Sequence, residues 1–305
     1  MPDDKPQLRP LVRSYAALED STVSASEIPA HIAHGLAQGE WRLLDIVKEL
    51  GESLVSESDS VRSRGVGLLS AVVANMDKSN LDRQSTKTLT TFFTDKLSDK
   101  PSMVACVTAL TGLTESPTFG TGEGMEVVRG LFSSVTLKSH PQAVRHTVYV
   151  LLDSLMSRSR PALKRLGSEF ISGYCSLVEG EKDPRNLMIS FSIVRVVLLE
   201  FDISKNVEDL FDITFCYFPI TFTPPPDDPY GITSDDLIEA LRGCLSATPH
   251  FGKLALPLFL DKMQAASEKA KRQTLQALTA CFPIYGAAVS GEWAGRFSEA
   301  LSIEV

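Results

Sequence analysis

Cysteine and histidine are the residues of this chain that could bind a metal or act as nucleophiles, and they are dispersed. The five cysteines include no C-x-x-C pair; they are Cys106, Cys175, Cys216, Cys244 and Cys281. Zinc sites and disulfide frameworks need clustered thiols, so this odd, scattered set predicts free thiols, most of them inside apolar helices. His31 and His34 have the spacing of two metal ligands on one helical face, but no third ligand follows them. We therefore expect no metal site and no bound cofactor.

Motifs of the common enzyme classes are absent from the sequence. It contains no phosphate-binding loop ending in Lys-Ser or Lys-Thr, no G-x-S-x-G turn and no H-E-x-x-H pair. The glycine-rich stretch 120–124 follows no predicted strand, and we interpret it as a flexible connection. The sequence thus predicts a protein that has no catalytic residues, is not an enzyme and takes no small-molecule substrate.

The charge distribution argues against nucleic acid as a direct partner. The formal net charge is −8, whereas binding to a phosphate backbone needs clustered lysine and arginine. The densest basic cluster consists of Arg158, Arg160, Lys164 and Arg165. It could attract an acidic partner, but a helix that ends near Met156 would favour positive charge at the same place, and we prefer that interpretation.

Neither a membrane span nor a secretion signal is evident in the sequence. The longest apolar stretches, such as 189–201 and 254–260, are shorter than the roughly 20 residues that a bilayer requires. The N-terminal residues lack a basic region followed by an apolar core. We expect an intracellular protein that does not bind membranes.

The segment 216–233 is rich in proline and interrupts the helical pattern around it. Its five prolines remove backbone donors, so we predict an extended insert between two repeats. It carries six residues of types that are common in protein interfaces: Tyr217, Phe218, Phe222, Asp227, Asp228 and Tyr230. They are candidate partner-binding residues. The alternative, which we prefer, is an inward-packed loop whose aromatic rings seal a seam between repeats.

Asp183 and Arg185 form a second candidate contact for a partner. The pair lies at the start of a predicted helix, where Asp183 precedes Pro184. Aspartate can cap the free N–H groups of a first turn, and proline is tolerated there because its missing donor would have no partner. Capping together with an ion pair between repeats is the simpler interpretation, and we prefer it.

An internal repeat determines how these residues are positioned. A helical apolar pattern begins at intervals of 42, 41, 43 and 83 residues, at Val61, Met103, Val144, Leu187 and Ala270. Each unit places apolar residues at i, i+4 and i+7, which lie on one face of a helix. An interval near 42 residues is typical of helical-pair repeats, which bury their apolar faces only by stacking on one another.

Both helices of each repeat can be located in the sequence. The second helices follow start signals at Asp59, Asp99, Ser139 and Asp183. The preceding helices are predicted at 41–54, 85–97, 124–135, 161–177, 207–215 and 253–263. We predict an all-α HEAT-repeat solenoid, a superhelix of about six to seven antiparallel helix pairs that forms a single array over residues 1–305.

An ordered set of short motifs resembles one protein family. The motifs are Arg145-His146-Thr147-Val148-Tyr149, Gly180-Glu181-Lys182-Asp183-Pro184-Arg185-Asn186-Leu187, Asp236-Leu237-Ile238, Thr248-Pro249, Leu256-Pro257-Leu258, Leu275-Gln276-Ala277-Leu278-Thr279-Ala280-Cys281 and Tyr285-Gly286. Together with the insert they extend over nearly the whole chain. In this respect the chain is similar to the N-terminal region of the Mms-nineteen (Met-eighteen) family.

The resemblance implies a function as an adaptor. Members of that family are large HEAT-repeat proteins of the cytosolic iron–sulfur cluster assembly (CIA) machinery. They join its targeting complex and present apo-client enzymes of DNA replication, repair and transcription for cluster insertion. The resemblance further implies links to TFIIH helicase subunits and a location in the cytoplasm and nucleus. Family members are much longer, so we expect this chain to lack their C-terminal repeats, which hold other targeting-complex subunits.

Two other functions are compatible with the same sequence. A HEAT-repeat scaffold of transport or phosphatase-type complexes would have the same fold and no connection to iron–sulfur proteins. A hydrolase or metalloprotein would need a site within the insert.

Overall fold

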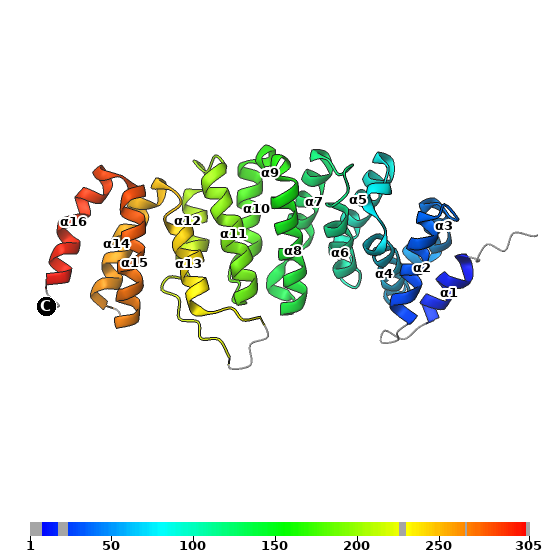
Figure 1. The fold of residues 1–305 in the computed structure, drawn as a ribbon, viewed down its shortest axis with the longest axis horizontal. Coiled ribbons are helices and arrows are strands. Elements are labelled where there is room, and N and C mark those ends of the chain that lie inside the picture. Colours follow the sequence, from blue (N-terminus) through cyan, green and yellow to red (C-terminus); the bar gives the residue numbers. More distant parts are fainter. Residues whose placement is uncertain (1–7, 18–23, 226–229, 266, 303–305) are drawn as a thin grey trace, which may run out of the picture. The chain divides into compact units, whose positions relative to one another are not determined.

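The computed structural model describes residues 8–17, 24–225, 230–265 and 267–302, and throughout these ranges its regular structure is helical (Figure 1). The chain divides into two compact units, one formed by Met1–Thr136 with Ala143–Arg165 and the other by Leu137–Gln142 with Leu166–Val305. No helix in the described ranges is both long enough and apolar enough to span a bilayer.

The first unit contains nine helices in its described part. They are α1 (Leu8–Ala17), α2 (Ser24–Ala37), α3 (Leu43–Leu54), α4 (Asp59–Asn75), α5 (Arg83–Asp95), α6 (Met103–Leu113), α7 (Thr121–Ser134), α8 (Gln142–Arg158) and α9 (Arg160–Leu166), with 3₁₀ turns η1 (Lys78–Asn80) and η2 (Lys96–Ser98). Helix α3 packs on α4 and α5 packs on α6, while α4 also packs on α6 and α5 on α7. First helices thus stack on first helices and second on second, as a helical-pair repeat requires.

The second unit continues the same arrangement within itself. Its described elements are η3 (Leu137–Ser139), α10 (Ser168–Val178), α11 (Pro184–Glu200), α12 (Val207–Phe215), α13 (Ser234–Leu245), η4 (Pro249–Phe251), α14 (Gly252–Ala265), α15 (Glu268–Tyr285) and α16 (Ala287–Ser302). Helix α10 packs on α12, α11 on α13, α13 on α15 and α14 on α16. The predicted fold class, an all-α HEAT-repeat solenoid, is confirmed by the packing inside both units.

Burial follows the repeat that the sequence predicts. The residues seven positions after each repeat start are all buried: Leu68, Leu110, Leu151, Val194 and Ala277. The first position is less uniform, because Val61 is 45% exposed whereas Met103 is buried. Four cysteines occupy the core as predicted, and only Cys216 is exposed. Burial raises the pKa of the Cys106 thiol to about 12, which keeps it protonated.

Two predicted segments differ from the structure because of glycine. The single helix predicted over 161–177 is divided into α9 and α10 at Gly167, whose φ of +54° suits only glycine. The stretch 120–124 is not a flexible connection but the start of α7, where the Glu123 carboxylate accepts the N–H of Gly120. Gly124 lies close to α9, since an added Cβ would approach that of Ala162 to 2.9 Å.

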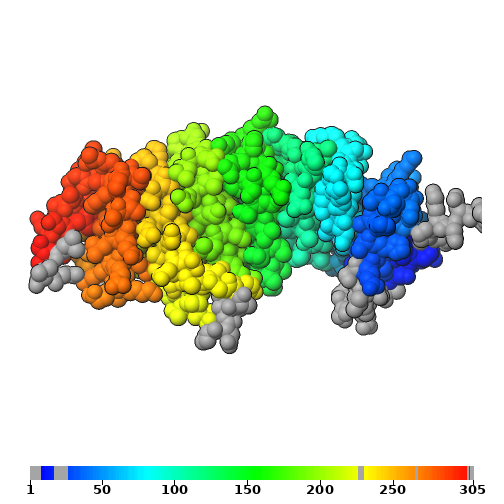
Figure 2. Space-filling view, viewed as in Figure 1, coloured from blue at the N-terminus to red at the C-terminus, as the bar shows by residue number. Residues whose placement is uncertain are grey.

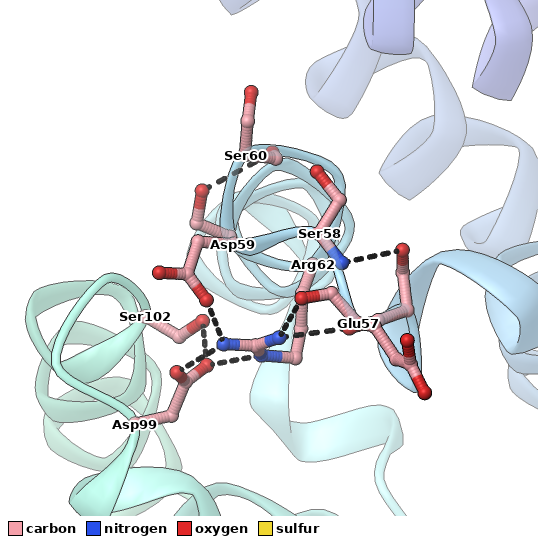
Figure 3. A network of polar contacts seen from close by, with 9 residues as sticks. Glu57, Ser58, Asp59, Ser60, Arg62, Asp99 and Ser102 are labelled. Carbon is pink, nitrogen blue, oxygen red and sulfur yellow. Dashed lines mark hydrogen bonds and ion pairs between the residues drawn. The ribbon is translucent and has the colours of Figure 1, made fainter.

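A polar network joins neighbouring repeats of the first unit (Figure 3). Arg62, in the first turn of α4, donates from Nε and Nη2 to the two carboxylate oxygens of Asp99 at 2.8 and 2.7 Å. Its Nη2 also contacts Asp59 Oδ1 at 2.6 Å, and its Nη1 donates to the Ser56 carbonyl at 2.8 Å. Ser102 Oγ donates to Asp99 as well. Arg62 and Asp99 therefore form a bidentate ion pair between repeats, whereas the contact of Arg62 with Asp59 lies within α4.

Replacing Asp99 by asparagine tests this network through its pH dependence. The hydrogen bond from Arg62 holds the pKa of Asp99 below its usual value, so the carboxylate stabilises the fold above the unfolded-state pKa of about 3.9. That contribution disappears as the pH falls through the lower folded-state pKa. We expect Asp99→Asn to lower the thermal midpoint by several degrees at pH 7, with the difference shrinking toward pH 3. Asp59→Asn is the control, because Asp59 is 72% exposed and binds the same arginine; an equal loss there would contradict the interpretation.

Candidate partner-binding site

The candidate residues Asp183 and Arg185 lie in the turn between α10 and α11. Gly180, with φ of +79°, reverses the chain after α10, and Pro184 opens α11. Asp183 Oδ1 accepts the N–H groups of Arg185 at 2.9 Å and of Asn186 at 3.3 Å, so it caps the helix as predicted. Arg185 Nε lies 3.3 Å from the same oxygen. The ion pair therefore forms within one helix start rather than between repeats.

Glu181, which was not among the candidate residues, stabilises this turn through hydrogen bonds. Its Oε1 accepts the N–H groups of Lys182 at 2.8 Å and Asp183 at 2.9 Å, and its Oε2 accepts Asn186 Nδ2 at 3.1 Å. Glu181 and Asp183 are each about 5% exposed. Local N–H groups satisfy both oxygens of Glu181 and Oδ1 of Asp183, whereas the buried Oδ2 of Asp183 has no hydrogen-bond partner among the described residues. The signal in the sequence was a second acidic residue two positions before the cap.

The insert returns to this turn through Tyr230. The Arg185 guanidinium carbon lies 3.9 Å from the centre of the Tyr230 ring, while the tyrosine remains 52% exposed. Arg185 is thus held by the Asp183 carboxylate and also lies against an aromatic face. The exposed Tyr230 and the partly buried Arg185, which the buried Asp183 carboxylate supports, form one surface feature that we call the Arg185–Tyr230 platform.

The beginning of the insert is fixed to the same turn by Tyr217. Its hydroxyl donates to the Glu181 carbonyl at 2.8 Å, and its ring meets Phe191 edge to face at 5.7 Å. Burial raises the pKa of Tyr217, so its hydroxyl keeps its proton and remains a donor. Tyr217 therefore attaches the beginning of the insert to the turn that carries the platform.

The other aromatic residues of the insert point in different directions. Phe218 is buried against the rings of Phe215 and Phe259 at 5.4 and 5.1 Å, so it belongs to the core. In Figure 2 the insert and α13 share the yellow surface, which lies beside the orange surface that includes α14. Phe222 is half-buried, and its carbonyl accepts Ser234 Oγ. Asp227 and Asp228 lie outside the described residues.

Gln273 of α15 binds the backbone of the insert near its beginning, at Ile220. Its Oε1 accepts the Ile220 N–H at 2.9 Å and its Nε2 donates to the Ile220 carbonyl at 3.0 Å. The side chain thereby pairs with the backbone as a neighbouring strand would. Gln273 was not among the candidate residues. The signal in the sequence was a polar residue within the apolar pattern of a predicted helix, and in the structure this residue is buried.

The remaining chemical candidates form no site in the described ranges. No group of three or more His, Cys, Asp or Glu side chains there is arranged to hold a metal ion. Arg158 is the last residue of α8, and Arg160 Nε donates to the Met156 carbonyl at 3.2 Å, as expected for positive charge at a helix end.

Comparison of the sequence with known proteins gives one family model and several relatives. The family model MMS19_N, described as Dos2-interacting transcription regulator of RNA-Pol-II, matches residues 47–305. The MMS19 nucleotide excision repair protein homologs of Bos taurus and Homo sapiens are each 36% identical to this chain over 91% of its length and 27% of theirs. The DNA repair/transcription protein mms19 of Schizosaccharomyces pombe is 32% identical over 85% of this chain and 26% of its own length. The chain thus spans about a quarter of the length of these relatives.

Proposed function

The chain belongs to the MMS19 family, and from this premise we propose that it is a non-enzymatic adaptor that holds other proteins together. In its finer form the proposal is that the chain serves cytosolic iron–sulfur protein assembly in the cytoplasm and nucleus. There it would link the CIA targeting complex to apo-clients of DNA replication, repair and transcription, TFIIH helicase subunits among them. An adaptor of this kind acts by raising the effective concentration of donor and client.

The Arg185–Tyr230 platform is the observation that carries the proposal. Tyrosine and arginine are the types most enriched among residues that dominate binding energy at interfaces. Here the ring is exposed, and the guanidinium is positioned by the buried Asp183 carboxylate before any partner arrives. A positioned pair loses little conformational entropy on binding, which favours affinity. The names of the relatives, which concern excision repair and transcription, agree with clients of this kind.

Affinity capture tests both the platform and the class of partner. The purified chain is immobilised and exposed to extract from iron-depleted cells, and bound proteins are identified by mass spectrometry. We expect enrichment of iron–sulfur enzymes, and a loss of about tenfold with Tyr230→Ala. Leu199→Ala is the matched control, because Leu199 is a 59% exposed residue of α11.

Two results would contradict the proposal in different ways. Capture of transport cargo or phosphatase subunits without iron–sulfur proteins would favour the rival scaffold function. Capture of iron–sulfur proteins that is equally strong with Tyr230→Ala would keep the adaptor function but remove the platform from the binding surface.

A further inference from the structure

A groove in the first unit is separate from the platform. It lies where the ends of α2 and α4 meet the starts of α3 and α5, and it has a volume of about 370 Å³. Ligand pockets in proteins range over about 300–1,000 Å³, so the groove can receive side chains of a partner. Its apolar lining is formed by Leu36, Trp41, Leu43, Leu44, Met76 and Leu81.

The floor of the groove is preformed. Trp41 is 9% exposed, and its indole packs so closely on Gly35 of α2 that an added Cβ would overlap the ring. Leu44, in the first turn of α3, is 58% exposed beside this floor. A large aliphatic side chain left in water next to a packed aromatic floor would gain about 25 cal/mol for each Å² that a partner covers.

One wall of the groove is acidic. Asp77 Oδ1 accepts the Ser79 N–H at 2.9 Å, and Asp82 Oδ1 accepts the Ser85 N–H at 2.6 Å. Hydrogen bonds from the Ser79 side chain and backbone lower the pKa of Asp77, and those from the Ser85 backbone and side chain lower the pKa of Asp82. Both carboxylates are therefore ionised at neutral pH.

The groove is also lined by the basic residue Arg42, which forms no ion pair with Asp77 or Asp82, and the cations nearest to these aspartates in sequence contact other groups. Lys78 Nζ donates to the Ala74 carbonyl at 2.8 Å and lies 4.0 Å from Glu115. Arg83 pairs with Glu123 at 2.7 Å and donates to the Thr118 carbonyl. Both side chains are thus engaged with other groups, and in the described ranges no ion pair uses Asp77 or Asp82.

We propose that this groove binds a short segment of a partner protein in which a large aliphatic side chain lies next to a lysine or arginine. The aliphatic group would cover Trp41 and Leu44, and the basic group would pair with Asp77 and Asp82. The acidic wall disfavours nucleic acid, whose phosphates would be repelled. This inference goes beyond the proposed function and does not depend on it, since it concerns another unit and another set of residues.

Peptide selection tests the groove directly. A phage-displayed library of random short peptides is selected on the purified chain, and the enriched peptides are synthesised with a fluorescent label for anisotropy titration. We expect them to combine leucine, isoleucine or methionine with lysine or arginine. Binding should weaken about tenfold with Leu44→Ser, and about tenfold with Asp77→Asn and Asp82→Asn combined. Asparagine still accepts the capping N–H groups, so the fold is retained.

Matched controls distinguish binding in the groove from non-specific binding to exposed apolar or acidic residues. Val55→Ser removes a 76% exposed aliphatic residue that does not line the groove. Asp202→Asn changes an aspartate with the same kind of cap, to the Ser204 N–H at 3.1 Å, in the other unit. Equal losses with these controls, no enriched peptide, or peptides without basic residues would overturn the proposal. It would also be overturned by a dimer in sedimentation that Leu44→Ser dissociates, because a second copy would then occupy the groove.

Discussion

Phe259→Ala is expected to lower the free energy of unfolding by about 3–5 kcal/mol. Phe259 has no exposed surface, and its ring lies 5.6 Å from that of Phe215 and 5.1 Å from that of Phe218. Removal of the ring leaves a cavity between α12, α14 and the insert, and the insert loses its main apolar anchor. Urea denaturation followed by circular dichroism measures the loss, and hydrogen exchange of residues 216–225 should accelerate with it.

Two variants of the same helix define what this result means. Phe259→Leu keeps most of the buried volume and should cost less than half as much as alanine. Leu258→Ala changes the adjacent residue, which is 36% exposed, and should alter stability little. If Phe259→Ala were no more harmful than Leu258→Ala, the insert would not be anchored by this aromatic cluster.

The repeat architecture was predictable because it is encoded locally. Apolar residues four and seven positions apart define a helical face within a single turn or two, and the cap at Asp183 acts on its own first turn. The break at Gly167 was missed because glycine within a helical pattern gives no warning that its φ will be positive. Helices α1, α2 and α16 also escaped prediction, since no start signal of the repeat precedes them.

The candidate site was only partly predictable because its partners are distant in sequence. Tyr230 reaches Arg185 from the far end of the insert, and Gln273 reaches Ile220 across 53 residues. No short pattern links such pairs, although the residue types themselves were recognisable. The aromatic residues of one insert consequently divide between the core, where Phe218 lies, and the surface, where Tyr230 lies.

Loss of the hydrogen bonds between Gln273 and Ile220 is the second change that we expect to lower the free energy of unfolding strongly. Gln273→Met preserves the length of the side chain but leaves the Ile220 N–H and carbonyl without partners in a buried position. An unsatisfied buried group costs about 1–3 kcal/mol, so we expect a loss of about 2–4 kcal/mol in the free energy of unfolding. Urea denaturation measures it, and faster exchange of the Ile220 amide locates it. Arg272→Met, at the neighbouring exposed position, is the control for a change on α15 alone.

The pH dependence of the variant Gln273→Glu distinguishes the hydrogen bonds to Ile220 from the packing of the side chain. The ionised carboxylate can accept the Ile220 N–H, but it repels the carbonyl and is poorly solvated, so its folded-state pKa must rise above the unfolded value of about 4.3. When protonated, the carboxyl again provides one donor and one acceptor, as glutamine does. The instability relative to the native chain should therefore be largest above the raised pKa and should shrink as the pH falls toward 4. If the loss of stability in Gln273→Glu did not change with pH, Gln273 would act through its shape alone. The protonation state of glutamate affects stability only if the side chain at this position is hydrogen-bonded to Ile220.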